Sequence, residues 1–306
     1  MLFVYGLAIG LLFVCLPSDA FAWGPGMHLD IALTMLEKTA LVAPAIRALM
    51  KAFPTDFLYG AVSPDIFIRK KMVGPLHHCH NWRMGMLLLT EAQTDRQRAA
   101  AYGYLAHLAA DVVAHNYFIP YKIVRSFTAR LLSHAYWELR FDLTVSPHVW
   151  EAVPQILAGD YREFDTLLER VMKKTLFSFK TSKRIYYSIL VLHRLRRLRG
   201  GLKVYARQSR WALHEERIAH YRRLVFHVVG EFLQKVERAP CCGGDPTGIA
   251  RQAEAMALRK RIRQALQRGP LTGATAERLV RLCRDRLEAE MFAPTMQWPD
   301  VYDVMR

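Results

Sequence analysis

The segment that most constrains the fold runs from Tyr104 to Phe118 and reads YLAHLAADVVAHNYF. Within it, His107, Asp111 and His115 follow one another at intervals of four residues. On an α-helix each of these side chains points within about 40° of the one before. Most other positions are apolar, and no Lys or Arg lies nearby to neutralise the carboxylate. The pattern therefore favours a buried helix with a metal site over one whose histidines are satisfied within the core.

Hydrophobic periodicity along the rest of the chain is also helical, and no stretch has convincing β-strand alternation. We therefore expect an all-α protein. Residues 57–68 should be a helix end leading into a loop that carries a buried Asp65. The other expected helices span residues 28–36, 41–53, 83–92, 96–118, 126–141, 164–179, 211–236, 249–268 and 272–292.

Residues 1–22 are typical of a secretory signal. Their apolar run, residues 2–16, is short for a membrane span, and Ala20-Phe21-Ala22 fits a small-x-small cleavage site. Lipidation at Cys15 is a poorer alternative because the bulky Val14 precedes it. Cleavage would make Trp23 the new amino terminus. The protein would then be exported and be periplasmic, envelope-associated or secreted.

The chain is strongly basic, with 43 Lys and Arg against 27 Asp and Glu and a net charge of +16. Much of the excess lies in residues 180–236 and 249–291, which either form solvated faces or adsorb to anionic lipid or nucleic acid. The sequence APCCGGDPTG, residues 239–248, is typical of a linker. We therefore expect a helical domain over residues 23–238 and a basic helical C-terminal extension over residues 239–306.

Further residues of metal-ligand type accumulate in the first half of the chain. His134 and Glu138 are four residues apart on a predicted helix, which is the same spacing as between His107, Asp111 and His115. The set exceeds what one tetrahedral ion needs, so a multinuclear zinc site accounts for it better. Its members are His28, Asp65, His77, His78, His80, His107, Asp111, His115, His134 and Glu138.

At the level of these motifs, the sequence resembles the zinc-dependent phospholipase C family, whose superfamily also includes fungal single-strand nucleases. Family members are all-α secreted enzymes with three zinc ions and a mature amino-terminal Trp that binds zinc. The matching motifs are Trp23 after the cleavage site, SPD with Asp65, His107-Leu-Ala-Ala-Asp111 and His134-Ala-Tyr-Trp-Glu138. They cover residues 23–140, and the fold is expected to extend to residue 238.

The resemblance implies three zinc ions and assigns the ligands of each. One zinc would take Asp65, His78, His107 and Asp111, with His80 the alternative to His78. A second would take the amine and carbonyl of Trp23, His28 and the shared Asp111. The third would take His115, His134 and Glu138, although His115 lies closer to Asp111 than in the best-known members. Asp65 is also the candidate to orient or deprotonate the attacking water.

The leading interpretation is an exported phosphodiester hydrolase that acts on phospholipid or another phosphodiester. Peripheral contact with an anionic membrane surface is left open as an alternative to a solvated basic face. A nuclease of the same superfamily is a weaker candidate, because Glu138 is typical of the phospholipases. A non-catalytic membrane-adsorbing zinc protein is the other rival, and no obligate protein partner is indicated. Asp142 and His148 are expected at the surface, and Cys79 in the core. Pairing among Cys241, Cys242 and Cys283 is left open.

Overall fold

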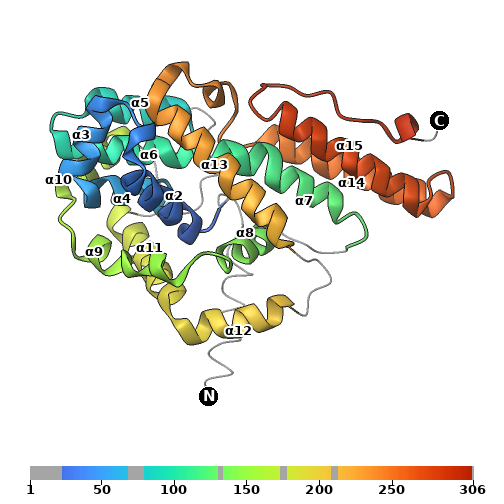
Figure 1. Ribbon diagram of the computed structural model, residues 1–306, viewed down its shortest axis with the longest axis horizontal. Helices are drawn as coiled ribbons and strands as arrows, with labels where there is room; N and C mark the ends of the chain where they lie inside the picture. Colours follow the sequence, from blue (N-terminus) through green and yellow to red (C-terminus); the bar gives the residue numbers. More distant parts are fainter. Residues whose placement is uncertain (1–22, 68–78, 130–133, 173–177, 208–212, 305–306) are drawn as a thin grey trace.

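The computed structural model describes residues 23–67, 79–129, 134–172, 178–207 and 213–304. These residues form helices and no strand, which confirms the all-α prediction (Figure 1). The α-helices are α2 Pro25–Glu37, α3 Pro44–Ala52, α4 Pro54–Val62, α5 Trp82–Glu91, α6 Asp95–Val113, α7 Ile119–Arg125, α8 His134–Asp142, α9 Val153–Ala158, α10 Arg162–Val171, α11 Phe179–Arg194, α12 Arg196–Arg207, α13 Glu215–Lys235, α14 Ile249–Arg268 and α15 Gly273–Ala289. Shorter helical segments are η1 Thr39–Leu41, η2 Ser63–Ile66, η5 Ala114–Phe118, η6 Pro147–Glu151, η7 Val236–Arg238, η8 Pro240–Gly243 and η9 Val301–Val304.

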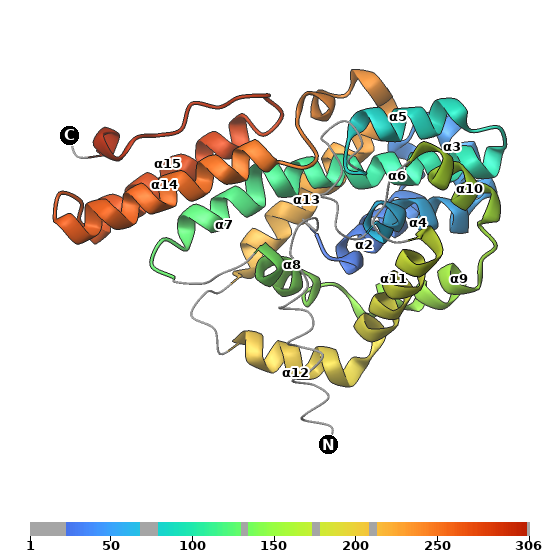
Figure 2. The ribbon, with the colours of Figure 1, turned by 180° about the vertical axis from the view of Figure 1, so that it is seen from behind.

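Helix α6 lies at the centre and packs against α4, α5 and α13 (Figures 1 and 2). It begins with a capping box in which Thr94 and Gln97 each satisfy the other's backbone N–H. From Ala99 to Val113 almost every residue is buried, so α6 has no solvated face along this stretch. A helix covered on all sides can hold ionisable groups only if they are paired or coordinated.

Two glycines allow α4 and α6 to approach at backbone distance. A Cβ atom added to Gly60 would lie 1.9 Å from the carbonyl oxygen of Ala100, and one added to Gly103 would lie 2.1 Å from that of Phe57. Neither backbone can accommodate such an atom without moving. The close contact brings η2, which follows α4 directly, beside the middle of α6.

The central helix does not run straight to Phe118 as the sequence predicted. Residues Ala114–Phe118 form the π-helical segment η5, and α7 follows with Pro120 in its first turn. Within a continuous α-helix, Pro120 would lack an N–H and its ring would clash with the carbonyl of Asn116. The wider π-turn directly before the proline removes this conflict.

Two expected helix boundaries were wrong. The chain turns at Ser126, which caps α7, and α8 begins only at His134, so residues 126–141 are not one helix. Likewise α10 ends at Val171 and a separate helix, α11, begins at Phe179. In both places the apolar pattern continues across the boundary between two helices, so periodicity alone does not reveal the boundary.

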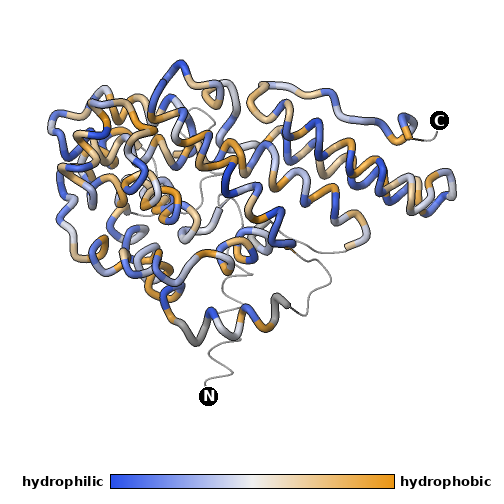
Figure 3. Tube along the Cα trace, viewed as in Figure 1, coloured by the Kyte–Doolittle hydropathy of each residue, from blue (hydrophilic) through white to orange (hydrophobic). Residues whose placement is uncertain are grey.

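Helices α14 and α15 lie against α7 and extend away from α3, α4 and α9 (Figures 1 and 2). Hydrophilic and hydrophobic residues alternate along both, as expected of helices with one buried face (Figure 3). In the segment before them, predicted as a linker, Cys241 is buried. Cys241, Cys242 and Cys283, whose pairing the sequence left open, are free thiols. No helix in the described part of the chain is long and apolar enough to cross a membrane.

Candidate metal centre

Five buried ligand-type side chains converge beside the middle of α6. His107 and Asp111 come from α6 itself, His28 from α2, Asp65 from η2 and His80 from the turn before α5. Two overlapping sets, His28 with His107 and Asp111 and Asp65 with His80 and His107, each place their donor atoms within 4.8 Å of one another. We call these five residues the buried cluster.

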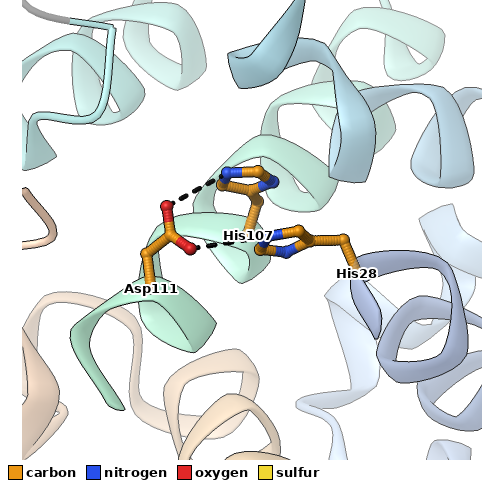
Figure 4. Close-up of side chains that lie close together, drawn as sticks. All are labelled: His28, His107 and Asp111. Carbon is orange, nitrogen blue, oxygen red and sulfur yellow. Dashed lines mark ion pairs between the residues drawn. The ribbon is translucent and has the colours of Figure 1, made fainter. Parts of the chain in front are cut away.

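Asp111 lies at the centre of the buried cluster. Its Oδ1 is 3.4 Å from Nε2 of His28, and its Oδ2 is 3.2 Å from Nε2 of His107 and 3.1 Å from Nε2 of His80 (Figure 4 shows the first two). Burial opposes ionisation of this carboxyl, but the nearby imidazoles outweigh burial and hold the pKa of Asp111 well below its usual range. Asp111 is therefore a carboxylate whose two oxygens face different sides of the cluster.

The ring of His107 is fixed by a hydrogen bond on the side away from Asp111. Its Nδ1 lies 2.9 Å from the carbonyl oxygen of Ala61, which can only accept, so Nδ1 carries the proton. In the neutral ring the lone pair is then on Nε2, which faces Asp111 and lies 3.0 Å from Nε2 of His80. Burial opposes protonation of His107, but the carboxylates of Asp111 and Asp65 outweigh burial and raise its pKa. The ring also stacks on His28, with centroids 3.6 Å apart. Burial and His107 together lower the pKa of His28, which favours its neutral, ligating form.

Asp65 and His80 complete the side of the cluster nearest η2. Oδ1 of Asp65 is 3.3 Å from Nε2 of His80 and 3.9 Å from Nε2 of His107. The Sγ atom of Cys79 lies 3.5 Å from Nδ1 of His80, on the far side of that ring. Cys79 is buried, as expected, and it contacts His80 on the Nδ1 side of the ring, whereas the Nε2 side faces Asp65 and Asp111.

The buried cluster fits a zinc site. Donor atoms bound about 2.0–2.2 Å from one tetrahedral zinc lie roughly 3.3 Å apart. The contacts described above between the donor atoms of the cluster run from 3.0 to 3.9 Å. In the described part of the chain no Lys or Arg pairs with Asp111, whose ion-pair partners are all histidines. Two buried carboxylates and three imidazoles form a set that a cation would complete.

Trp23 lies next to the cluster, and its indole is fully buried. The indole Nε1 donates a hydrogen bond of 3.0 Å to the carbonyl oxygen of Ala110, the residue before Asp111, and the ring stacks on Phe118. The start of α2 is thereby held against α6. Ligation by a free Trp23 amine depends on cleavage after Ala22 and stays a prediction.

Asp142 was expected at the surface, and this was wrong. It is buried on α8, where its two oxygens each accept a 2.9 Å hydrogen bond from the backbone N–H groups of Gly26 and Met27. It therefore caps α2, the helix that carries His28, whose own N-cap Gly24 has no side chain to do so. Burial raises the pKa of Asp142 to about 7. The i,i+4 spacing from Glu138 was the sequence signal that could have identified it; His148, in contrast, is exposed as expected.

His115 lies one turn beyond Asp111, in η5, and contacts a different part of the chain. Its Nδ1 is 2.5 Å from the carbonyl oxygen of Pro246. The neighbouring Asn116 donates to the carbonyl of Asp245, and Trp82 donates to that of Gly244. The segment predicted as a linker thus packs against this end of the central helix. No sequence pattern linked residues 244–248 to His115.

The remaining predicted ligands divide into two groups. Glu138 is buried on α8, but it and His115 are not members of the two donor sets found among the described residues. The side chain of His134 and the whole of His77 and His78 lie outside the described residues. Of the two alternatives left open by the resemblance, His80 is the one seen in the buried cluster.

Comparison with known proteins identifies a family. Residues 27–184, just over half of the 306-residue chain, match the family described as zinc dependent phospholipase C. No curated protein and no solved structure matches the chain. The matched range contains all five residues of the buried cluster.

Proposed function

The chain belongs to the zinc-dependent phospholipase C family, and we propose that it is an exported zinc-dependent phosphodiester hydrolase acting on phospholipid or a related phosphodiester. The observation that carries the proposal is the buried cluster, in which the two oxygens of Asp111 face His28 on one side and His80 and His107 on the other. An ionised carboxylate with this arrangement suits a position between two cations.

Zinc, when bound, acidifies water and polarises phosphoryl oxygens, which is the chemistry that phosphodiester hydrolysis needs. The chain's own residues would hold and orient it. We propose that His28 and Asp111 belong to one ion, and that Asp65, His80, His107 and the same Asp111 belong to another. The hydrogen bond from His107 to Ala61 keeps its Nε2 directed at Asp111.

Asp65 is the proposed group that orients the attacking water or takes its proton. It is buried and sits at the edge of the cluster, with Oδ1 directed at His80 and His107. A carboxylate held in this way can act as a proton acceptor at short range. We further propose a third zinc held by His115, His134 and Glu138, and a contribution from the Trp23 amine after export.

The test is a substrate panel with metal removal. Purified protein would be assayed on phosphatidylcholine, on anionic phospholipids and on single-stranded DNA, before and after chelation and again after zinc is restored. The proposal expects zinc-dependent release of the phosphorylated headgroup. Zinc-dependent cleavage of DNA alone would favour the nuclease alternative. Zinc binding without turnover of any substrate would favour a non-catalytic protein.

A further inference from the structure

One stretch of the chain carries its positive charge without any acidic residue. Between Glu169 and Glu215, residues 170–214 contain 13 Lys and Arg and no Asp or Glu. Residues 249–291, which are also basic, contain 10 Lys and Arg with 5 Asp and Glu. In the second stretch Arg261, Arg284 and Arg286 pair with acidic neighbours. The first stretch, which includes α11 and α12, has no such compensation within its own sequence.

The exposed residues of α11 gather on one face. Lys180, Arg184 and Arg194 are exposed there, with Thr181 and Ser188 between them. At about 100° of rotation per residue, these five side chains all lie within one half of the helix circumference. The ion pairs of the described residues include one from the neighbouring Lys183 to Asp165 and none from Lys180, Arg184 or Arg194. This face is therefore an uncompensated cationic surface.

Large aliphatic side chains are exposed on the same surface. Ile185 is 37% exposed, Val191 44% and Leu195, directly after α11, 49%. On α12, Val204 is 58% exposed. Soluble proteins commonly expose single aliphatic residues, but a row of them flanked by unpaired Lys and Arg is typical of a helix that lies in a membrane interface.

The opposite face of α11 lies against the candidate metal centre. Phe179 packs on Phe67, just after η2, with ring centroids 5.6 Å apart. Tyr186 is buried, and burial together with the nearby Asp65 raises its pKa well above the usual range. Near the other end, His193 lies 3.7 Å from Asp142. One helix thus separates the site from the cationic surface, and α12 stands at the edge of the molecule away from α14 and α15 (Figures 1 and 2).

We propose that the outer face of α11 is a docking surface for a membrane that contains anionic lipid. Lys and Arg side chains are attracted to the negative surface of such a membrane, and exposed aliphatic groups add apolar burial at the headgroup boundary. Nucleic acid would attract the charge equally but would leave Ile185, Val191 and Leu195 without a role. Docking here would bring lipid beside the helix that covers the site. The inference deepens the proposed function, yet binding can be measured whether or not lipid is hydrolysed.

The experiment is co-sedimentation of the purified full-length protein with vesicles of phosphatidylcholine alone or with a minority of phosphatidylglycerol, with headgroup release measured in the same samples. The charge variant is Lys180→Glu with Arg184→Glu. The matched control is Lys260→Glu with Arg281→Glu, which reverses two exposed charges of α14 and α15. An aliphatic variant, Val191→Ser with Leu195→Ser, tests the apolar component. Circular dichroism and zinc content check that each variant is folded.

We expect binding to the anionic vesicles only, weakened about tenfold or more by the charge variant and unchanged in the control. The aliphatic variant should retain binding at low salt and lose it as salt screens the charges. Equal loss in the test and control pairs, equal binding to neutral vesicles, or a matching loss of binding to single-stranded DNA would overturn the proposal. Vesicle binding without headgroup release would support the docking surface and contradict the proposed hydrolysis of phospholipid.

Discussion

His107 and His115 stand at equal distances in sequence from Asp111, one on each side, but they have different surroundings. Each directs Nδ1 at a main-chain carbonyl, that of Ala61 for His107 and that of Pro246 for His115. His107 lies in regular α6, and its Nε2 meets the buried cluster. His115 lies in the π-turn and faces a loop from the C-terminal region. Identical spacing therefore does not place two ligands in one site when the helix changes its winding between them.

The largest effect is expected for Asp111→Asn. The amide keeps the shape but offers only one acceptor oxygen and no negative charge, so the ligands on both sides of the cluster lose their shared carboxylate. We expect activity to fall by more than about 100-fold. Losing a residue that only hydrogen-bonds to a metal ligand already costs up to about 100-fold, and Asp111 is proposed to be a ligand itself. Zinc content and headgroup release measured on the same sample check this. A fully metallated and active Asp111→Asn protein would refute the sharing.

A smaller loss of zinc and of activity is expected for His115→Ala, which leaves His107 and the rest of the buried cluster unchanged. The buried cluster should keep its zinc, so that metal content falls by one ion at most. His107→Ala provides the reference and should lose more metal and more activity. Metal analysis of the two purified variants compares the two sides directly. If His115→Ala also removed the zinc of the buried cluster, the conclusion that His115 lies in a separate environment from His107 would be wrong.

Two glycine substitutions test the surroundings of His107 and of His115 separately, because each disturbs the backbone next to one of them. Gly103→Ala forces α4 away from α6 and should destabilise the protein by about 1–3 kcal/mol while weakening zinc binding. Gly248 has φ of +54° and lies against His115, so Gly248→Ala should cost about 1–2 kcal/mol. Denaturant unfolding gives both values. Only Gly103→Ala is expected to change the zinc affinity of the buried cluster, and the same change in both variants would argue against two separate environments.

The smallest effect is expected for Asp142→Asn, which leaves one of the two α2 N–H groups without an acceptor and should cost about 1 kcal/mol. The folded pKa of about 7 adds a pH dependence. Because the folded protein holds this proton more tightly than the unfolded chain, that part of the stability is present near pH 4 and is lost as the pH rises to about 7. Around Asp142 lie His193 of α11, Glu138 of α8 and Arg199 of α12.

Thermal unfolding of wild type and Asp142→Asn across this pH range measures the effect. The deficit of the variant should shrink as the pH rises. A constant deficit would mean that the carboxyl is ionised to the same extent in the folded and unfolded protein, so that its pKa is not raised by folding.

The sequence predicted the helical class, and helical spacing on an apolar segment singled out His107 and Asp111 because such side chains are costly to bury unless they are paired or bind a metal. His28, Asp65 and His80, the last as the alternative to His78, were assigned to zinc ions only through the family resemblance, and their role as ligands stays a prediction.

Prediction from the sequence failed where structure depends on contacts between distant segments. The packing of residues 244–248 against His115 and the capping of α2 by Asp142 join residues more than 100 positions apart. The π-turn was missed although Pro120 gave a local signal for it.

The most direct test of the shared carboxylate is the zinc content of the purified protein, wild type and Asp111→Asn, by elemental analysis. We predict about three zinc ions per wild-type chain and a substoichiometric amount in the variant, because two of the proposed ions share Asp111. A wild-type protein that binds no zinc after reconstitution, or a variant that binds as much as wild type, would contradict this prediction.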